Sequence, residues 1–167
     1  MRTLASERSA GLIELARVVT WAGSLWLLIP LALGCCVLLA RAGRAADALA
    51  VALSLGGAIA IADAAKALVG RPRPLVEHLQ HVTGSSFPSS HASQAGAFWT
   101  SLLLVVLAAN RGRRVSWIAG IVTAVTVLAV AWSRVYLGVH YPSDVIAGAL
   151  LGSGWALFTR STLGRLR

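Results

Sequence analysis

The sequence predicts an all-α fold, a polytopic transmembrane helix bundle with about five spanning helices. Composition is the first observation behind this prediction, because 57% of the 167 residues are hydrophobic and only 13% are charged. The second is that uncharged stretches recur at the length an α-helix needs to cross a hydrocarbon core roughly 30 Å thick. The chain length fits a single domain, residues 1–167. Three long uncharged runs lie at residues 18–40, 92–110 and 115–133, and two shorter runs at 48–62 and 145–159 can be extended by polar end residues.

The N-terminal segment, residues 1–17, mixes Leu and Ile with Arg and Glu. Leu12, Leu15 and Ala16 fall at i, i+3 and i+4, the spacing of one face of a helix. The segment therefore forms either a short interfacial helix or a frayed tail, and the sequence leaves both interpretations open.

The first spanning helix is expected over residues 18–40, with a kink at Pro30. A second is expected over about residues 47–69. The polar segment at residues 70–90 then holds most of the loop signals of the chain, so we expect it to connect helices at one membrane face.

A third helix is expected to start near Ser90 and a fourth to cover about residues 115–135. A fifth is expected to start near Pro142, since proline suits the first turn of a helix. Gly148 and Gly152 follow in it at the G-x-x-x-G spacing, which is common in membrane helices and does not by itself identify a contact.

The net charge of +9 would suggest a nucleic-acid partner in a soluble protein. Here many basic residues cluster between apolar runs, so we expect a membrane rather than nucleic acid to be their partner. With five spans the clusters share one face, which the positive-inside rule makes cytoplasmic. The clustered arginines are Arg41 and Arg44, Arg111, Arg113 and Arg114, and Arg160, Arg165 and Arg167.

A second group of ionisable residues falls on the opposite face. Three separate segments contribute to it: the end of the second helix, the start of the third, and the junction between the fourth and fifth. A grouping of cations, histidines and a carboxylate is typical of phosphate chemistry. The residues are Lys66, Arg71 and Arg73, then Ser89, Ser90 and His91, then Ser133, Arg134, His140 and Asp144.

Each residue type in this group suits binding to an anion. Arg73 and Arg134 can hold phosphate oxygens with paired donors, and Lys66, the only lysine in the chain, adds a compact charge. Ser89 or Ser90 is expected to cap the third helix, whose free backbone N–H groups would face the anion.

Two residues of the group suit nucleophilic catalysis. Asp144 follows His140 by four residues and can accept an imidazole N–H, which leaves the other ring nitrogen free to attack. His78 and His81 are interpreted as solvated loop histidines. Asp63 precedes Lys66 by three residues and is expected to neutralise that lysine rather than to act in catalysis.

Three motifs in this group resemble the signatures of the type 2 phosphatidic acid phosphatase and vanadium haloperoxidase superfamily. Their order, spacing and placement at one membrane face agree with the membrane lipid phosphatase branch of that family. One difference is Ser90, which stands where glycine is usual. The motifs are Lys66 followed after six residues by Arg73-Pro74, the run Pro88-Ser89-Ser90-His91, and Ser133-Arg134 followed by His140 and Asp144.

The resemblance implies a role for each residue. His140 would be the nucleophile that forms a phosphohistidine, and Asp144 would orient it. His91 would protonate the leaving oxygen and then activate water. The phosphate would be bound by Lys66, Arg73, Ser89 and Arg134, together with the backbone N–H of Ser90.

The sequence therefore predicts a multi-pass cell-membrane phosphatase that uses no metal or other cofactor and acts on a lipid phosphate from the extracytoplasmic face. A polyprenyl diphosphate is weakly preferred over phosphatidylglycerophosphate, phosphatidate or a polyprenyl-phosphoryl sugar phosphate. One alternative is a non-catalytic protein that binds anionic lipid headgroups. A second is a metal enzyme that uses its histidines, but their spacing fits no compact metal motif. The oligomeric state is left open.

Overall fold

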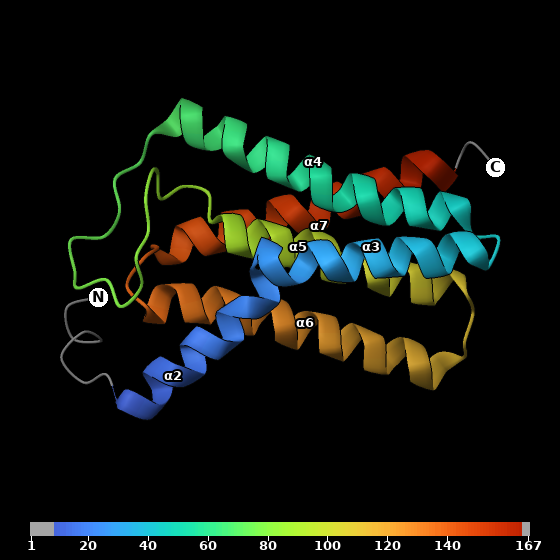
Figure 1. Cartoon of the computed structure of the whole chain (residues 1–167), viewed down its shortest axis with the longest axis horizontal. Coiled ribbons are helices and arrows are strands. Elements are labelled where there is room, and N and C mark those ends of the chain that lie inside the picture. Colours follow the sequence, from blue (N-terminus) through green and yellow to red (C-terminus); the bar gives the residue numbers. More distant parts are fainter. Residues whose placement is uncertain (1–8, 165–167) are drawn as a thin grey trace.

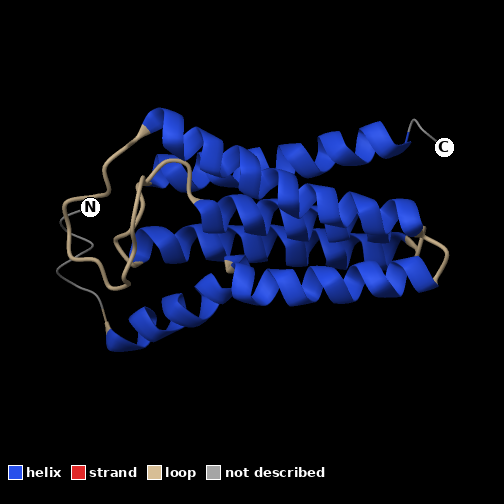
Figure 2. Cartoon of the chain, turned by 45° about the horizontal axis from the view of Figure 1, so that its top comes forward, coloured by secondary structure: helices blue, strands red, loops and turns tan. Residues whose placement is uncertain are grey.

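The computed structural model describes residues 9–164, and in that range all regular structure is helical (Figure 1). The long helices lie side by side in one bundle (Figure 2), so the predicted all-α bundle is confirmed. The elements are α2 (Ala10–Val19), the 3-10 turn η1 (Thr20–Gly23), α3 (Leu25–Arg41), α4 (Ala45–Val69), α5 (Ser90–Ala108), α6 (Arg113–Tyr136) and α7 (Pro142–Gly164).

Four segments of the described chain are long and apolar enough to cross a membrane: residues 10–41 taken together, α4, α5 and α6. The fifth long helix, α7, has 23 residues but is not one of the four. It carries glycine and serine at several positions and packs against α4, α5 and α6. A helix that faces other helices needs small residues for close contact more than it needs apolar bulk.

The N-terminal part differs from the prediction of one helix over residues 18–40. The helical path breaks at Ser24, whose backbone is extended, and Pro30 lies inside α3 rather than at the break. Gly23 explains the position of the break, because a Cβ there would lie 2.6 Å from the carbonyl oxygen of His91. This close approach seats η1 against the start of α5. Helix α2 forms over part of the predicted interfacial segment, and residues 1–8 lie outside the described range.

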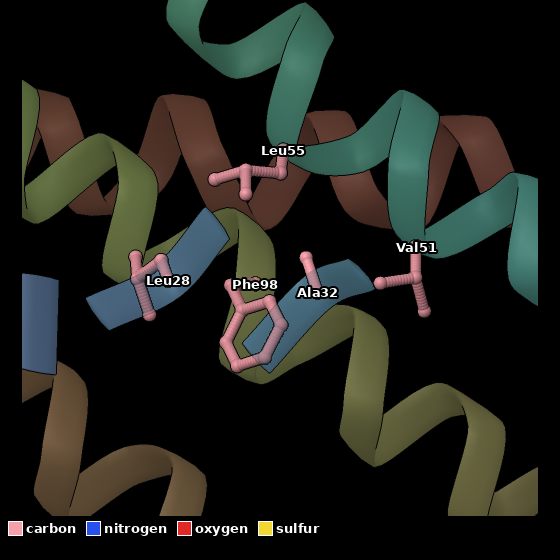
Figure 3. Close-up of a cluster of buried hydrophobic side chains, with 5 residues drawn as sticks. All are labelled: Leu28, Ala32, Val51, Leu55 and Phe98. Carbon is pink, nitrogen blue, oxygen red and sulfur yellow. The ribbon is translucent and has the colours of Figure 1, made fainter. Parts of the chain in front are cut away.

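The centre of the bundle is the contact between α5 and α7. Gly148 and Gly152 of α7 face the backbone of Ser89 and Ser93, where a Cβ at either glycine would clash. The G-x-x-x-G spacing thus brings α7 against the first turns of α5. Beside this contact, α3, α4 and α5 share an apolar cluster that contains Phe98 (Figure 3). The buried members of this cluster are Leu28, Ala32, Val51, Leu55 and Phe98.

The chain order places three junctions at one end of the bundle: the end of α4 with the following loop, the start of α5, and the turn between α6 and α7 (Figure 1). The clustered arginines of the described chain lie at the other end, as predicted. There the buried carboxylate of Asp47 pairs with Arg44 at 2.7 Å and with Arg160 of α7. This ion cluster fastens the last helix to the start of α4.

Candidate active site

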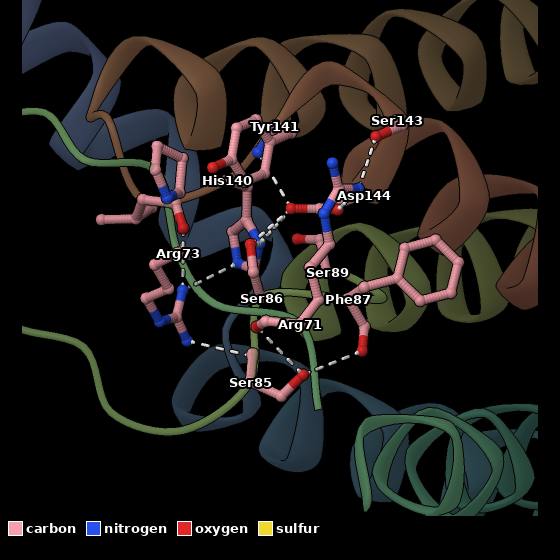
Figure 4. A network of polar contacts seen from close by, with 12 residues as sticks. Arg71, Arg73, Ser85, Ser86, Phe87, Ser89, His140, Tyr141, Ser143 and Asp144 are labelled. Atoms are coloured by element: carbon pink, nitrogen blue, oxygen red, sulfur yellow. Dashed lines mark hydrogen bonds and ion pairs between the residues drawn. The ribbon is translucent and has the colours of Figure 1, made fainter. Parts of the chain in front are cut away.

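Predicted site residues from the loop and from the turn between α6 and α7 lie close together, among them Arg73, Ser89, His140 and Asp144 (Figure 4). The long loop, residues 70–89, closes over the turn between α6 and α7. Its Arg73 donates to the Val139 carbonyl at 2.8 Å, and the backbone N–H of Ser89 donates to the Asp144 carbonyl at 3.0 Å. These bonds attach the first and second predicted motifs to the third.

His140 and Asp144 lie together, but without the direct hydrogen bond that was expected. Nδ1 of His140 is 3.6 Å from Oδ2 of Asp144, an ion-pair distance that is too long for a hydrogen bond. Asp144 is completely buried and also accepts from the backbone N–H of Tyr141 at 2.9 Å. The carboxylate is therefore fixed at the first turn of α7, which begins at Pro142 as predicted.

Ser86 lies close to both Asp144 and His140, and this contact was not predicted from the sequence. Its buried hydroxyl forms a short hydrogen bond to Oδ2 of Asp144 and lies 3.4 Å from Nδ1 of His140. Serine is common in loops, so the residue type alone indicates no role for Ser86. Its position two residues before the Pro-Ser-Ser-His run is the signal that could have identified it.

Arg71 holds the other side of the Asp144 carboxylate. Its Nη1 donates to Oδ1 at 2.8 Å and also to the Ser143 hydroxyl at 2.8 Å. The guanidinium lies over the Tyr141 ring, 4.3 Å from its centroid. The sequence placed Arg71 among the cations of the group but did not assign it a contact. Its charge compensates the buried carboxylate, so the remaining cations stay available to an anion.

His140 is buried, with 3% of its side chain exposed. Burial, followed by the charges of Arg134, Arg73 and Lys66, lowers the pKa of His140 to about 3. The ring is therefore neutral at pH 7. Its Nδ1 faces Ser86 and Asp144, and its Nε2 lies 3.4 Å from Nη1 of Arg73. With the proton on Nδ1, Nε2 carries the free lone pair.

The three predicted phosphate-binding cations are fixed by other groups of the protein. Arg73 donates to the carbonyls of Thr83, Gly84 and Val139, and Lys66 donates to the Ser85 carbonyl at 2.8 Å. The charge of Asp63 acts on Lys66, as predicted, but the two form no close ion pair among the described residues. The amine of Lys66 turns toward the loop instead.

Arg134 is almost fully buried, and its Nη1 donates to the hydroxyl of Thr20 and the side-chain oxygen of Gln80. Its Nε is buried and has no hydrogen-bond partner in the described chain. Such an orphaned donor is costly unless a ligand satisfies it.

Ser89 occupies the N-cap position of α5, but the predicted cap is absent because its side chain makes no capping hydrogen bond. Its Oγ is also buried without a partner among the residues described. Ser90 is the first residue of α5, where backbone N–H groups have no partner inside the helix. An anion at this position would satisfy the Ser89 hydroxyl and the free N–H groups together.

His91, in the first turn of α5, is within electrostatic range of His140, Lys66, Arg73 and Arg134. It also lines a cavity of 520 Å³ between α5 and the N-terminal segment. His91 thus lies at the boundary between the cation cluster and this open space.

The remaining histidines lie outside this cluster. His78 bonds through Nε2 to the Pro74 carbonyl at 2.9 Å, and His81 is exposed.

Within residues 9–164, no three His, Cys, Asp or Glu side chains are grouped closely enough to hold a metal ion. The arrangement instead brings together a neutral imidazole, a second histidine and three cations.

Comparison with known proteins identifies a family and a fold. The sequence model of the PAP2 superfamily matches residues 47–167. The chain also resembles the crystal structure of a transmembrane PAP2-type phosphatidylglycerolphosphate phosphatase from Bacillus subtilis, with a TM-score of 0.90. The alignment covers 99% of this chain and 83% of that one at 24% identity, so the likeness concerns the fold.

Two curated relatives share part of the sequence. An undecaprenyl-diphosphatase of Sulfolobus acidocaldarius is 46% identical over 76 residues, which cover 46% of this chain and 32% of the relative. A lipid A 1-phosphatase of Rhizobium etli is 32% identical over 117 residues, 63% of this chain and 45% of the relative. The matched segments thus span less than half of either relative.

Proposed function

The chain belongs to the PAP2 superfamily, and we propose that it is a membrane lipid phosphatase that acts through a phosphohistidine at His140. The observation that carries the proposal is the convergence at one end of a transmembrane bundle of a neutral, buried imidazole with His91 and the three cations. Two buried atoms that lack a hydrogen-bond partner within residues 9–164, Oγ of Ser89 and Nε of Arg134, support a phosphate position among these groups.

In the first step, Nε2 of His140 attacks phosphorus while the bond from phosphorus to the leaving oxygen breaks. The electron pair of that bond stays on the oxygen, and His91 donates a proton to it. Asp144 and Ser86 hold the Nδ1–H side of His140 and stabilise the imidazolium that forms. Lys66, Arg73 and Arg134 stabilise the charge on the equatorial oxygens.

In the second step, His91 is neutral and takes a proton from water as the water oxygen attacks phosphorus. The bond between Nε2 of His140 and phosphorus breaks, so inorganic phosphate leaves and the imidazole becomes neutral again. The Arg71 ion pair compensates the charge of the buried Asp144 carboxylate throughout the cycle.

The substrate class follows from where the site lies. It is at the end of a bundle whose outer surface is apolar, so a lipid can present its phosphate there while its chain remains in the bilayer. We favour a polyprenyl diphosphate, in line with the relative named as an undecaprenyl-diphosphatase. Phosphatidylglycerophosphate, phosphatidate and a polyprenyl-phosphoryl sugar phosphate are the other candidates.

The site is proposed to face the outside of the cell. Arg41, Arg111 and Arg114 are exposed at the opposite end of the bundle, and the positive-inside rule places such clusters in the cytoplasm. In intact cells, a cysteine at Thr83 in the site loop should be labelled by a membrane-impermeant thiol reagent, and one at Arg114 should not. The reverse labelling pattern would contradict this orientation.

The function is tested by measuring phosphate release from purified protein in detergent with a panel of lipid phosphates. His140→Gln is the matched control, because it keeps a polar side chain of similar size and removes the nucleophile. We expect release from at least one lipid by the wild type and none by the variant. Equal release by both proteins, or no release by either, would contradict the proposal.

A further inference from the structure

A cavity lies beside His91, one of the proposed catalytic groups. It has a volume of 520 Å³, and the N-terminal segment and the site loop line it together. His91 faces it from α5, Gln80 from the loop, and Arg17 from α2. A cation that is not needed by the phosphate-binding cluster therefore shares a cavity with the proposed general acid.

Arg17 is held at this position by weak bonds. Its Nη2 donates to the Leu79 carbonyl at 3.3 Å, and its Nη1 pairs with Glu14 at 2.6 Å. Half of the Arg17 side chain is exposed, as is 67% of that of Glu14. Exposed ion pairs between such residues contribute little, so an incoming anion can replace Glu14 at low cost.

The Arg17 side of the cavity is connected to the catalytic cluster through Arg134. Leu79, which holds Arg17, is the neighbour of Gln80, whose side-chain oxygen accepts from Arg134. Thr20, the other acceptor for Arg134, lines the same cavity. Arg134, one of the proposed phosphate-binding cations, therefore donates to two residues that line the cavity, and Arg17 lines the same cavity.

Apolar hollows continue from this cavity along α3. The next hollow, of 550 Å³, shares Trp26 with the cavity, and a third shares Ile29 with the second. Trp26 and Ile29 are exposed on the outside of the bundle. A lipid whose polar end occupies the cavity would thus have an apolar path for its chain along α3.

We propose that Arg17 binds the phosphate that remains on the lipid, so that the site is selective for lipid diphosphates over lipid monophosphates. This inference rests on the proposed function. Because His91 protonates the leaving oxygen, the leaving part of the substrate lies on the His91 side, which is the cavity.

With a diphosphate, Nε2 of His140 bonds to the terminal phosphorus and the bond to the bridging oxygen breaks. The electron pair stays on that oxygen, which takes the proton of His91 and remains part of a lipid monophosphate. Arg17 stabilises this anion as it forms. With a monophosphate the leaving group is an alcohol, which gives Arg17 no anion to bind.

The test compares kcat/KM for the diphosphate and the monophosphate of one isoprenoid alcohol. Arg17→Gln should lower the value for the diphosphate by about tenfold and change that for the monophosphate less than about twofold, since it removes one partly exposed charged contact. Arg17→Lys should restore most of the preference. Arg114→Gln, at the opposite end of the bundle, is the control and should change neither value.

The ratio of the two values within one preparation does not depend on how much of the variant is folded. An equal loss on both substrates in Arg17→Gln would overturn the assignment of Arg17 and leave the proposed function standing. If the wild type hydrolyses neither isoprenoid phosphate but releases phosphate from another lipid of the panel, this inference is overturned and the proposed function stands. Release from no lipid of the panel would overturn both.

Discussion

The hydroxyl of Ser86 hydrogen bonds to the Asp144 carboxylate and lies 3.4 Å from Nδ1 of His140, while the carboxylate itself is 3.6 Å from that nitrogen. The orientation of the proposed nucleophile therefore depends on a residue from the site loop as well as on the carboxylate one helical turn away. The loop thus contributes to the proposed catalytic apparatus in addition to covering it.

Ser86→Ala is expected to lower kcat by about tenfold to a hundredfold, because it removes a hydrogen bond to a charged group that fixes the imidazole. Asp144→Asn should lower it further, since the imidazolium would lose its counter-charge. Steady-state kinetics with the best lipid phosphate would measure both effects. Ser85→Ala is the matched control, as its hydroxyl donates to the carbonyls of Arg71 and Phe87 and not to His140 or Asp144. A Ser86→Ala enzyme with unchanged kcat would show that the hydroxyl does not orient His140.

The buried imidazole predicts a dependence of stability on pH. The pKa of His140 is about 3 in the folded protein, and an unfolded histidine has a value near 6.5. Below pH 6.5 the unfolded state therefore binds a proton that the folded state does not, so stability falls as pH falls toward 3. Between pH 6.5 and 5 this residue should account for a loss of about 1–2 kcal/mol.

Chemical unfolding in detergent at pH 7 and at pH 5 would measure that loss. His140→Gln should lose less stability than the wild type over this interval, because glutamine does not titrate. His81→Gln, which changes an exposed histidine, should behave like the wild type. Identical pH dependence in the wild type and His140→Gln would contradict the burial of a neutral imidazole.

The ion cluster at the opposite end predicts a structural effect that is separate from catalysis. Asp47→Ala leaves Arg44 and Arg160 facing each other without the buried carboxylate, and both arginines are largely covered. Loss of one partner of a buried pair costs about 3–5 kcal/mol, and the partial exposure of these arginines reduces this to about 1–3 kcal/mol.

Thermal unfolding in detergent should therefore occur at a lower temperature in Asp47→Ala, while kcat per folded molecule stays near that of the wild type. Asp63→Ala, at an exposed position of α4, should unfold like the wild type. A full-stability Asp47→Ala variant would mean that α7 does not depend on this cluster.

Activity is expected to survive excess chelator and to be inhibited by vanadate. Lys66, Arg73 and Arg134 supply the positive charge that Mg²⁺ gives to many other phosphoryl-transfer enzymes, and protein contacts fix them before substrate arrives. Vanadate readily becomes five-coordinate with a nitrogen at one apex, so it resembles phosphorus under attack by His140. Loss of activity on chelation with recovery on adding Mg²⁺ would argue against this arrangement, as would insensitivity to vanadate at concentrations where phosphate inhibits.

The membrane bundle and the grouping of the site residues could be predicted from sequence because apolar runs of spanning length fix the order in which chain segments reach each membrane face. Lys66, His91 and His140 lie in different segments, yet the chain order alone puts them at one end. The start of α7 at Pro142 was predictable for a local reason, since proline is favoured in the first turn of a helix.

The contacts inside the site could not be predicted in the same way. The path of residues 70–89 follows no periodic pattern, so nothing in the sequence brings Ser86 to Asp144 or Gln80 to Arg134. The break at Ser24 depends on Gly23 lying against the backbone of α5, a contact between distant segments. The charge of Asp63 acts on Lys66 as helical spacing predicted, but the hydrogen bond of the lysine to the Ser85 carbonyl of the loop could not be predicted.

The most direct test of the central claim is to trap the phosphorylated enzyme. Wild type and His91→Gln would be mixed with a lipid phosphate labelled in its terminal phosphoryl group, quenched within milliseconds in alkali, and digested for peptide mapping. The wild type should carry base-stable, acid-labile label on the peptide that contains His140, and His140→Gln should carry none. His91→Gln lacks both the proton donor for the leaving oxygen and the group that activates water, so its label should form more slowly and remain longer on the same peptide. Label on another residue, or label retained in His140→Gln, would contradict the assignment of His140 as the nucleophile.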